Sequence, residues 1–376
     1  MFTPKDHHYM SLALRLAEKG KYTTHPNPRV GCIIVKDDKI IGEGFHVRAG
    51  EPHAEVNALQ MAGSKAENAT AYVTLEPCSH TGRTPPCATA LINAGIKRVI
   101  AAMQDPNPLV AGSGLKMLEK EGIEIASGLL ETQARKLNAG FIKRMEQGLP
   151  FVRVKLAMGL DGRTAMASGE SMWITGSAAR QDVQRLRAQS DAILTAKGTV
   201  MMDNPSLNVR LSAKELGIQG AIRQPVRVIL DSDLSTPCNA KLFSLAGESW
   251  IFTNSQNTDK SHAKVQALKN AGAEVINMGL QGRLPLKLVL QELAKRQINE
   301  IHVEAGATLC GALLQEGLVD EIVVYMAPHI MGCNTRGLFD LPNIDKMQDR
   351  IDIKIQDIRA IGDDWRITAI PITQNK

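Results

Sequence analysis

The chain of 376 residues is longer than one ordinary domain and fits two domains of about 150–200 residues. Hydrophobic residues make up 44% and charged residues 22%, as in globular proteins, but aromatic residues make up only 4% and the net charge is +5. So few rings and so mild a charge argue against a nucleic-acid surface built from stacking rings or a dense basic patch. They are compatible with small phosphorylated ligands.

The cysteines and the N-terminal sequence indicate a cytoplasmic protein. Two of the six cysteines fall in a metal motif, and the other four show no disulfide spacing, so we expect free thiols in a reducing compartment. The first residues contain no apolar signal region, and no run approaches 18 apolar residues. We therefore expect no membrane partner.

The first half of the chain alternates between strand and helix patterns. Apolar periodicity, glycine stops and turn residues predict these elements: helix 6–20, strands 30–35 and 39–45, a helix after residue 53, strand 71–75, helix 87–94, strand 98–103, helix 114–121, strand 123–126 and helix 131–146. Such alternation predicts an α/β domain whose sheet lies between helix layers.

The clearest chemical signal is a histidine followed by two cysteines. One imidazole and two thiols, from His53, Cys78 and Cys87, form a ligand set for Zn²⁺ that leaves a fourth position for water. A ligand histidine, a glutamate two residues later, Pro-Cys and a second cysteine is the order typical of zinc-dependent base deaminases. Glu55 is then expected to move protons rather than bind the metal.

The geometry of this motif sets one condition. Residues two apart do not share a helix face, so His53 and Glu55 converge only if the metal lies off the N-terminus of a helix that begins near Pro52. The helix after Cys87 would bring a second positive helix end to the metal. The alternatives are a closed structural zinc site, with His80 as the nearby fourth ligand, or buried cysteines beside an unrelated histidine.

The loop between the two cysteines is unusually long. Eight residues separate Cys78 from Cys87, where the usual deaminase signature has two. The zinc prediction survives because the order of ligands matters more than loop length, and the enlarged loop indicates a particular substrate.

The second half begins near residues 147–150 and again alternates. Strands are predicted at 151–156, 192–195, 226–230, 250–253, 274–278 and 321–325, with a helix at 177–188. Residues 301–314 predict a strand, a glycine-bearing turn and a helix, an arrangement that can present backbone N–H groups to phosphate. A tight strand-to-helix turn without a ligand explains this stretch as well. Neither a Rossmann nor a P-loop glycine pattern is present.

Residues 26–31, 53–55 and 77–87 resemble the deaminase half of the bacterial bifunctional RibD family of riboflavin biosynthesis, whose pattern includes the long cysteine loop. The resemblance implies a cytidine-deaminase-like three-layer αβα domain over residues 1–147. It also implies that Asn27 holds the pyrimidine and that His46 and His80 lie near the phosphoribosyl group. Taken alone, Asn27 fits a turn residue between prolines better than a ligand contact, and each histidine fits a site residue and an ordinary loop residue equally well.

Residues 155–163, 173–175, 203–205 and 303–306 resemble the reductase half of the same family, although Gly159 stands where its members often have serine. This implies a dihydrofolate-reductase-like α/β domain over residues 148–376 that uses NADPH. The implied cofactor contacts are Ala157, Trp173, Thr199, Asp203, Ser232, Gly306, Ala307, Thr308, Leu309, Cys310, Gly311 and Ala312. The implied substrate contacts are Ser171, Arg187, Leu207, Arg210 and Glu304.

Lys155 and Glu304 are the charged residues expected to polarise the sugar carbonyl and handle its proton. A strand-end ion pair is the alternative for each of them. Arg187 could be a solvated helix charge, whereas Arg210 suits phosphate because a guanidinium binds it through two hydrogen bonds.

The resemblance implies a bifunctional enzyme with two successive reactions. The first is zinc-dependent deamination of 2,5-diamino-6-(5-phosphoribosylamino)pyrimidin-4(3H)-one. The second is NADPH-dependent reduction of the ribosyl chain of 5-amino-6-(5-phosphoribosylamino)uracil. We expect one zinc per chain and a homo-oligomer that binds small molecules only. The rivals are a nucleic-acid or nucleoside deaminase with an accessory ligand-binding domain, and a non-catalytic zinc module with a ligand-sensing half.

Overall fold

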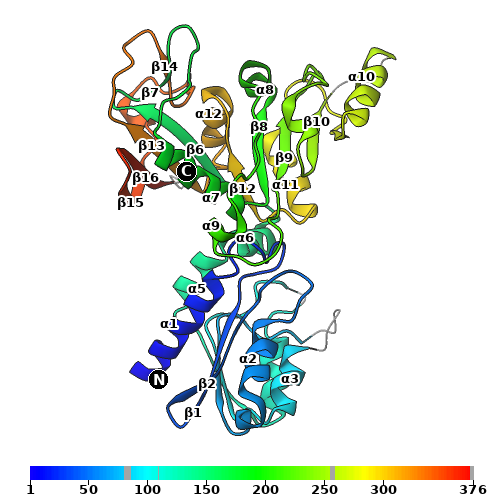
Figure 1. The fold of residues 1–376 in the computed structure, drawn as a ribbon, viewed down its shortest axis with the longest axis vertical. Helices are drawn as coiled ribbons and strands as arrows, with labels where there is room; N and C mark the ends of the chain where they lie inside the picture. The colour runs from blue at the N-terminus through cyan, green and yellow to red at the C-terminus, as the bar shows by residue number, and fades with distance from the viewer. Residues whose placement is uncertain (80–85, 109, 255–258, 373–376) are drawn as a thin grey trace. The chain divides into compact units, whose positions relative to one another are not determined.

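The computed structural model describes residues 1–79, 86–108, 110–254 and 259–372 (Figure 1). The chain divides into two compact units, which are Met1–Leu149, the N-terminal unit, and Pro150–Lys376, the C-terminal unit. Within the described residues, no helix combines the length and the apolar character needed to cross a bilayer.

The N-terminal unit is built on a five-stranded sheet with the order β2-β1-β3-β4-β5. β1 pairs antiparallel with both β2 and β3, whereas β3, β4 and β5 pair in parallel. The strands β2, β3, β4 and β5 therefore all run in one direction and end at the same edge. Their bounds are β1 Gly31–Lys36, β2 Lys39–Phe45, β3 Thr70–Val73, β4 Arg98–Ala101 and β5 Glu124–Ser127.

Helices cover both faces of this sheet. One apolar cluster joins one face to α2 (Ala54–Ala62), η1 (Gly63–Ala66), α3 (Cys87–Asn93) and α4 (Ser113–Lys120). A second cluster joins the opposite face to α1 (Pro4–Glu18), α5 (Glu131–Leu137) and α6 (Ala139–Gln147). The expected three-layer arrangement is confirmed.

The single helix predicted over residues 131–146 is wrong, because α5 and α6 are separate helices. Asn138 lies between them with φ −112°. Its side-chain oxygen accepts from the Arg29 N–H at 2.8 Å, and its amide donates to the Arg29 carbonyl at 2.9 Å. This pairing with a segment 109 residues away in the chain competes with helical geometry at Asn138.

Two glycines allow α2 to lie directly against β2. A Cβ atom at Gly42 would stand 2.3 Å from the Ala58 carbonyl oxygen, and one at Gly44 would stand 2.2 Å from that of Ala54. Neither position can carry a side chain without moving the helix away from the strand. The close approach fixes the first turn of α2, which carries Glu55 and follows His53.

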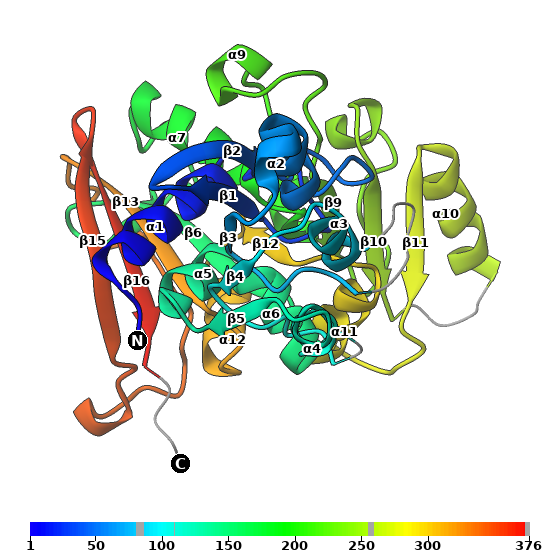
Figure 2. The same cartoon turned by 90° about the horizontal axis from the view of Figure 1, so that it is seen from below.

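The C-terminal unit contains a nine-stranded sheet with the order β11-β10-β9-β8-β12-β6-β13-β16-β15 and a separate β14-β7 pair. Pairing is parallel from β11 to β13 and antiparallel through β16 and β15, a hairpin that forms one edge (Figure 2). The bounds are β6 Phe151–Gly159, β7 Arg163–Ala165, β8 Ala192–Ala196, β9 Val226–Leu230, β10 Ser249–Thr253, β11 Ala273–Asn277, β12 Glu300–Val303, β13 Glu321–Ala327, β14 Arg336–Gly337, β15 Ile353–Ile361 and β16 Asp364–Pro371.

The helices of this unit are α7 Ser177–Gln189, α8 Lys197–Asp203, α9 Ala213–Leu216, α10 Asp259–Asn270, α11 Leu286–Lys295 and α12 Ala307–Gln315, with short η2 Lys241–Ser244 and η3 Met347–Asp349. α7 packs on β13 through Ala179 and Val183, which contact Val323 and Tyr325. The pattern analysis found the parallel strands but not the β15–β16 hairpin or the β7–β14 pair.

Glu76, which follows β3, organises the loop around the predicted metal motif. Its buried carboxylate, 3% exposed, accepts hydrogen bonds from the backbone N–H groups of Asp105 (3.1 Å), Gly112 (2.9 Å), Gly114 (2.8 Å) and Leu115 (3.3 Å). One side chain therefore ties the segment before Cys78 to the start of α4.

Replacing this carboxylate should weaken the N-terminal unit. In Glu76→Gln, an amide NH₂ faces backbone N–H groups, so two of them lose their acceptor, and we expect a loss of about 2–3 kcal/mol. All three tryptophans lie after residue 150, so fluorescence does not follow this unit. Amide exchange of β3 and α4 peptides, together with far-UV circular dichroism in urea, measures the change.

The matched control is Glu119→Gln on the exposed side of α4. It removes the same charge without a buried hydrogen-bond network and should change stability by less than about 0.5 kcal/mol. Equal protection of β3 and α4 in the two variants would contradict the role given to Glu76.

Candidate active sites

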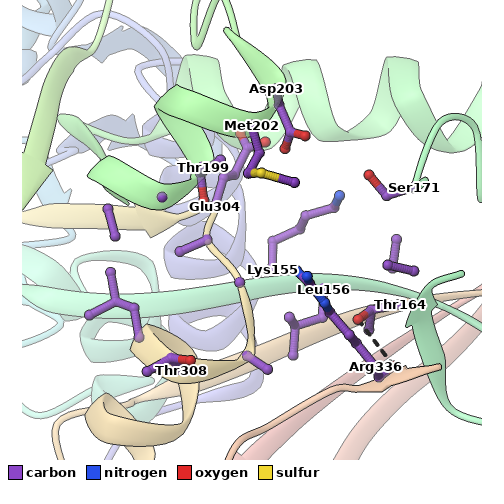
Figure 3. A pocket seen from close by; sticks show the side chains of 18 of the residues that line it. Lys155, Leu156, Thr164, Ser171, Thr199, Met202, Asp203, Glu304, Thr308 and Arg336 are labelled. Atoms are coloured by element: carbon purple, nitrogen blue, oxygen red, sulfur yellow. Dashed lines mark hydrogen bonds between the residues drawn. The ribbon is translucent and has the colours of Figure 1, made fainter. Parts of the chain in front are cut away.

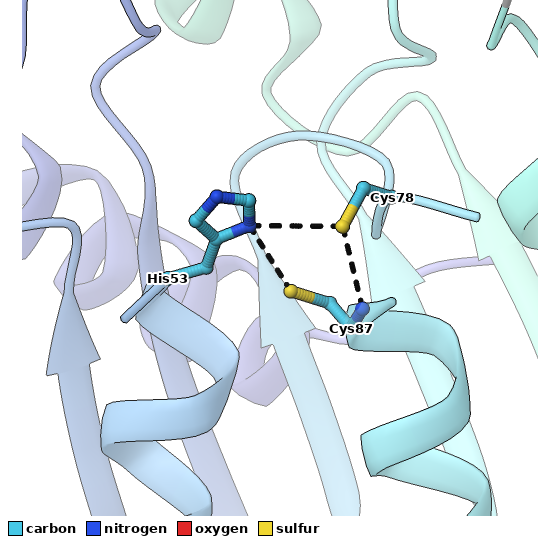
Figure 4. Close-up of side chains that lie close together, drawn as sticks. All are labelled: His53, Cys78 and Cys87. Atoms are coloured by element: carbon cyan, nitrogen blue, oxygen red, sulfur yellow. Dashed lines mark hydrogen bonds between the residues drawn. The ribbon is translucent and has the colours of Figure 1, made fainter. Parts of the chain in front are cut away.

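Three potential metal ligands converge at the sheet edge of the N-terminal unit (Figure 4). His53 is the N-cap residue of α2, Cys87 is the first residue of α3, and Cys78 follows β3. The His53 Nδ1 atom lies 3.2 Å from the Cys87 sulfur and 3.6 Å from the Cys78 sulfur, and all three ligand atoms lie within 4.8 Å of one another. The expected helix start near Pro52 is confirmed.

This donor set fits zinc. Tetrahedral zinc with bonds of about 2.0–2.3 Å separates its nitrogen and sulfur ligands by about 3.5–3.8 Å, close to the observed spacing. The backbone N–H of Cys87 donates to the Cys78 sulfur at 3.3 Å. Hydrogen bonding from Cys87, and then from His53, lowers the pKa of the Cys78 thiol to about 4, which favours the thiolate that binds metal.

Glu55 lies beside these ligands without belonging to their set. Its side chain is 3% exposed, and burial raises its pKa to about 7. The same carboxyl interacts electrostatically with His53, Cys78 and Cys87. A carboxyl whose pKa is near neutrality can both accept and release a proton at physiological pH.

His46 and Asn27 form a second layer next to His53. The His46 Nδ1 atom is 3.2 Å from the Pro52 carbonyl, which only accepts, and burial lowers the pKa of this histidine. A neutral His46 therefore donates from Nδ1 and accepts at Nε2, where the Asn27 amide NH₂ lies at 3.1 Å. This arrangement leaves the Asn27 Oδ1 atom available for a ligand.

The predicted substrate contacts in this unit stay predictions. His46 is only 2% exposed, and its ring packs edge-on against that of His53 at 5.2 Å. His46 therefore contacts Asn27 and the metal ligand His53. His80 lies outside the described residues.

The C-terminal unit contains a cavity of about 760 Å³ between β6, α8, the start of α12 and the β7–β14 pair (Figure 3). This volume suits a cofactor-sized ligand. Twelve residues that the family resemblance assigns to cofactor or substrate line it: Lys155, Ala157, Ser171, Arg187, Thr199, Asp203, Leu207, Glu304, Gly306, Ala307, Thr308 and Leu309. Gly306 is the N-cap of α12 and makes no side-chain cap hydrogen bond, so the first turn of this helix can present backbone N–H groups to phosphate.

The other six assigned residues do not line the cavity. Trp173 is 69% exposed under the Arg180 guanidinium, Arg210 is exposed, and the Ser232 carbonyl accepts from Thr253. Cys310 and Gly311 are buried within α12, and Ala312 follows them. Their contacts with NADPH or substrate stay predictions.

Glu304 is held by Arg187 at the edge of the cavity. The Arg187 Nε atom donates to Oε1 at 2.5 Å and Nη2 donates to Oε2 at 2.9 Å. Burial alone would raise the pKa of Glu304, but Arg187 and then His302 hold it well below its usual value. Arg187 is therefore not a solvated helix charge, and Glu304 remains a carboxylate.

Lys155 extends from β6 into the same cavity (Figure 3). Burial lowers its pKa, while Glu304 opposes that effect and Arg187 adds to it. A lysine of this kind releases its proton more readily than one in water. Lys155 and Glu304 therefore have opposite electrostatic characters, since one is a potential proton donor and the other a fixed anion.

The pattern analysis missed the wall formed by residues 336–340. Arg336, Phe339 and Asp340 line the cavity, and the Thr164 hydroxyl lies 3.4 Å from the Arg336 carbonyl. Figure 3 shows the Arg336 side chain reaching into the cavity. No local motif marks this segment, which reaches the site through the β7–β14 pairing and through the Asp340 N–H, which donates to the Ala307 carbonyl at 3.1 Å.

Comparisons with known proteins identify a family for each unit. The family model "RibD C-terminal domain" matches residues 150–367, and "Cytidine and deoxycytidylate deaminase zinc-binding region" matches residues 3–103. Riboflavin biosynthesis protein RibD of Escherichia coli (strain K12) is 52% identical over 365 residues, covering 96% of this chain and 98% of that protein. RibD of Bacillus amyloliquefaciens is 44% identical, covering 97% and 96%.

Solved structures agree over the full length. Acinetobacter baumannii RibD is 47% identical and matches with a TM-score of 0.90, covering 98% of this chain and 99% of that one. A diaminohydroxyphosphoribosylaminopyrimidine deaminase/5-amino-6-(5-phosphoribosylamino)uracil reductase from Thermotoga maritima is 32% identical, with a TM-score of 0.85 and the same coverage. Because the zinc-binding region and the reductase domain follow one another in one chain, as in these relatives, the chain belongs to the RibD family of riboflavin biosynthesis proteins.

Proposed function

We propose that the chain catalyses two consecutive steps of riboflavin biosynthesis. The N-terminal unit deaminates 2,5-diamino-6-(5-phosphoribosylamino)pyrimidin-4(3H)-one, and the C-terminal unit reduces the ribosyl chain of the resulting 5-amino-6-(5-phosphoribosylamino)uracil with NADPH. The observation that carries the proposal is that one chain holds both a His-Cys-Cys cluster beside buried Glu55 and a cavity lined by Lys155 and Glu304. We further propose that the enzyme is a cytoplasmic homo-oligomer.

In the deamination, Glu55 transfers the protons. Zinc bound by His53, Cys78 and Cys87 makes water acidic enough to react at neutral pH. Glu55 accepts a proton from the attacking water and passes it to the 2-amino group of the pyrimidine. A carbon–oxygen bond forms, the carbon–nitrogen bond breaks, and ammonia leaves. The Asn27 Oδ1 atom, left free by His46, orients the ring through its N–H groups.

In the reduction, Lys155 and Glu304 have separate roles. NADPH supplies the hydride that reaches C1 of the ribosyl group. Lys155 donates a proton to the sugar ring oxygen as the bond between this oxygen and C1 breaks. The product is the open ribityl chain. Glu304 remains ionised beside Arg187, so it accepts hydrogen bonds from sugar hydroxyls and does not donate a proton. The start of α12 binds the cofactor phosphates.

The rival functions explain less of the molecule. A nucleic-acid or nucleoside deaminase with an accessory binding domain gives no reason for a reductase family domain over residues 150–367. A non-catalytic zinc module gives no reason for the buried Glu55 carboxyl, which lies beside the three metal ligands but is not one of them. Ammonia release without NADPH, followed by NADPH consumption only after deamination, would support the proposal over both rivals.

Replacing Glu55 should separate the two activities. In Glu55→Gln, the side chain cannot transfer a proton, so ammonia release should fall about 10²- to 10⁴-fold while zinc content and melting temperature change little. Metal analysis and an ammonia assay on the same preparation measure this. Loss of zinc in the variant would make Glu55 a structural residue.

The control for that variant is removal of the metal. A chelator should abolish ammonia release but leave NADPH-dependent reduction of the already deaminated pyrimidine unchanged. If the chelator also stopped the reduction, the assignment of the two reactions to separate units would be wrong.

The pH dependence of the reduction rate should follow the protonation state of Lys155. Because the proton donor is the charged lysine and burial lowers its pKa below the usual value, the turnover rate should fall as pH rises through that lowered pKa. Lys155→Arg keeps the charge but cannot release a proton, so it should lose about 10²-fold or more in kcat. Steady-state rates with deaminated substrate between pH 6 and 10 test both expectations; unchanged turnover by Lys155→Arg would exclude Lys155 as the donor.

A further inference from the structure

A strip of charged and polar side chains lies beneath the reductase cavity. Glu300, His302 and Glu304 alternate along and just beyond β12, so their side chains project to one face of the sheet. On the adjacent strand β6, Arg153 pairs in register with His302, and Lys155 follows two residues later on the same face. Lys155 and Glu304, the two residues predicted to act in the reduction, therefore share this face with His302, which has not been given a role.

His302 is fully buried and contacts the Glu304 carboxylate. Its side chain is 0% exposed, and its Nε2 atom lies 3.4 Å from the Glu304 Oε1 atom. Within the described parts of the chain, neither ring nitrogen meets hydrogen-bond geometry with a partner, so the 3.4 Å approach to Glu304 is an electrostatic contact. Buried polar atoms are seldom left without a hydrogen bond, so the placement of this imidazole against Glu304 is the feature to be explained.

The surrounding charges decide which form this histidine takes. It faces Glu304 just beyond β12, Arg153 on β6 and Arg187 on α7, and burial lowers its pKa. Arg153 is itself engaged by Glu300 at 3.6 Å and by Glu321 on β13. Because Nε2 is the ring nitrogen that approaches the ionised Glu304 carboxylate, electrostatic attraction favours the neutral tautomer with its proton on Nε2.

The two oxygens of Glu304 are thus held differently. Among the described residues, Oε1 lies against both Arg187 Nε and His302 Nε2, whereas Oε2 accepts a hydrogen bond from Arg187 Nη2 alone. Arg187 in turn donates from Nη1 to the Asn208 carbonyl at 2.9 Å, which anchors it. With Oε1 occupied from two sides, the carboxylate cannot rotate freely, and Oε2 keeps lone pairs for a ligand.

We propose that His302 is a positioning residue for the reduction, which holds the Glu304 carboxylate so that Oε2 faces the sugar hydroxyls. This inference rests on the proposed reductase function. An apolar residue at this buried position would support the sheet without the cost of burying an imidazole, as Ile301 and Val303 do on the opposite face. His302 touches no ligand itself and acts through Glu304.

The test compares His302→Phe with His302→Gln. Phenylalanine fills the space but removes the N–H, whereas glutamine can place an amide N–H near the position of Nε2. We expect kcat for reduction to fall about 10- to 100-fold in His302→Phe with little change in the KM for NADPH, and His302→Gln to recover most of the loss. Ammonia release from the N-terminal unit of the same chain should be unchanged and serves as the internal control.

A double-mutant comparison separates positioning from general support. In a Glu304→Gln background, His302→Phe should cause no further loss of kcat, because the group it positions has already changed. An equal loss in both backgrounds, unchanged kcat in His302→Phe, or failure of His302→Gln to restore any activity would overturn the proposal.

A measurement without substrate distinguishes this inference from the proposed function. Nitrogen NMR of ¹⁵N-histidine-labelled protein, assigned with His302→Gln, should show a neutral Nε2–H imidazole at pH 7 whose signal moves in Glu304→Gln. If that signal is present but the wild-type chain reduces no substrate, the proposed function fails while the contact stands. If His302 is charged, or insensitive to residue 304, the positioning role fails regardless of activity.

Discussion

Both candidate sites depend on one constraint, which is that neighbouring strands running in the same direction end at the same edge of their sheet. In the N-terminal unit, β2 and β3 flank the antiparallel β1 and end at the same edge, so the segment that carries His53 and the segment that carries Cys78 both begin at that edge. In the C-terminal unit, the residues that follow β8 and β12 line one cavity with β6. Residues distant in sequence meet there because the sheet brings them together.

Backbone contacts then hold these strand ends in place. Without side chains at Gly42 and Gly44, α2 lies directly on β2, which places Glu55 beside the metal ligands. Glu76 binds four backbone N–H groups and so fixes the segment that leads to Cys78. Neither feature touches a substrate, yet a shift of about 1 Å in either would misplace the proton-transfer group.

The sequence predicted what depends on local patterns and missed what depends on distant pairs. The zinc ligands and the parallel strands could be predicted, because each is marked by a short motif or an apolar run. The break at Asn138 could not, since its cause is a backbone partner at Arg29. The same holds for Arg187, whose partner Glu304 lies 117 residues away, and for Arg336, which reaches the cavity through a two-strand pairing.

The two glutamates illustrate how surroundings assign a role to the same side chain. Glu55 is buried, and desolvation raises its pKa to about 7, which allows it to carry a proton in either direction. Glu304 is also desolvated, but Arg187 and His302 together outweigh that effect and hold its pKa well below the usual value, so it stays ionised. A proton shuttle and a fixed anion thus arise from one residue type. Because the fixed anion cannot supply a proton, the proposed reduction needs a different donor, and we assign that role to Lys155, which extends into the same cavity.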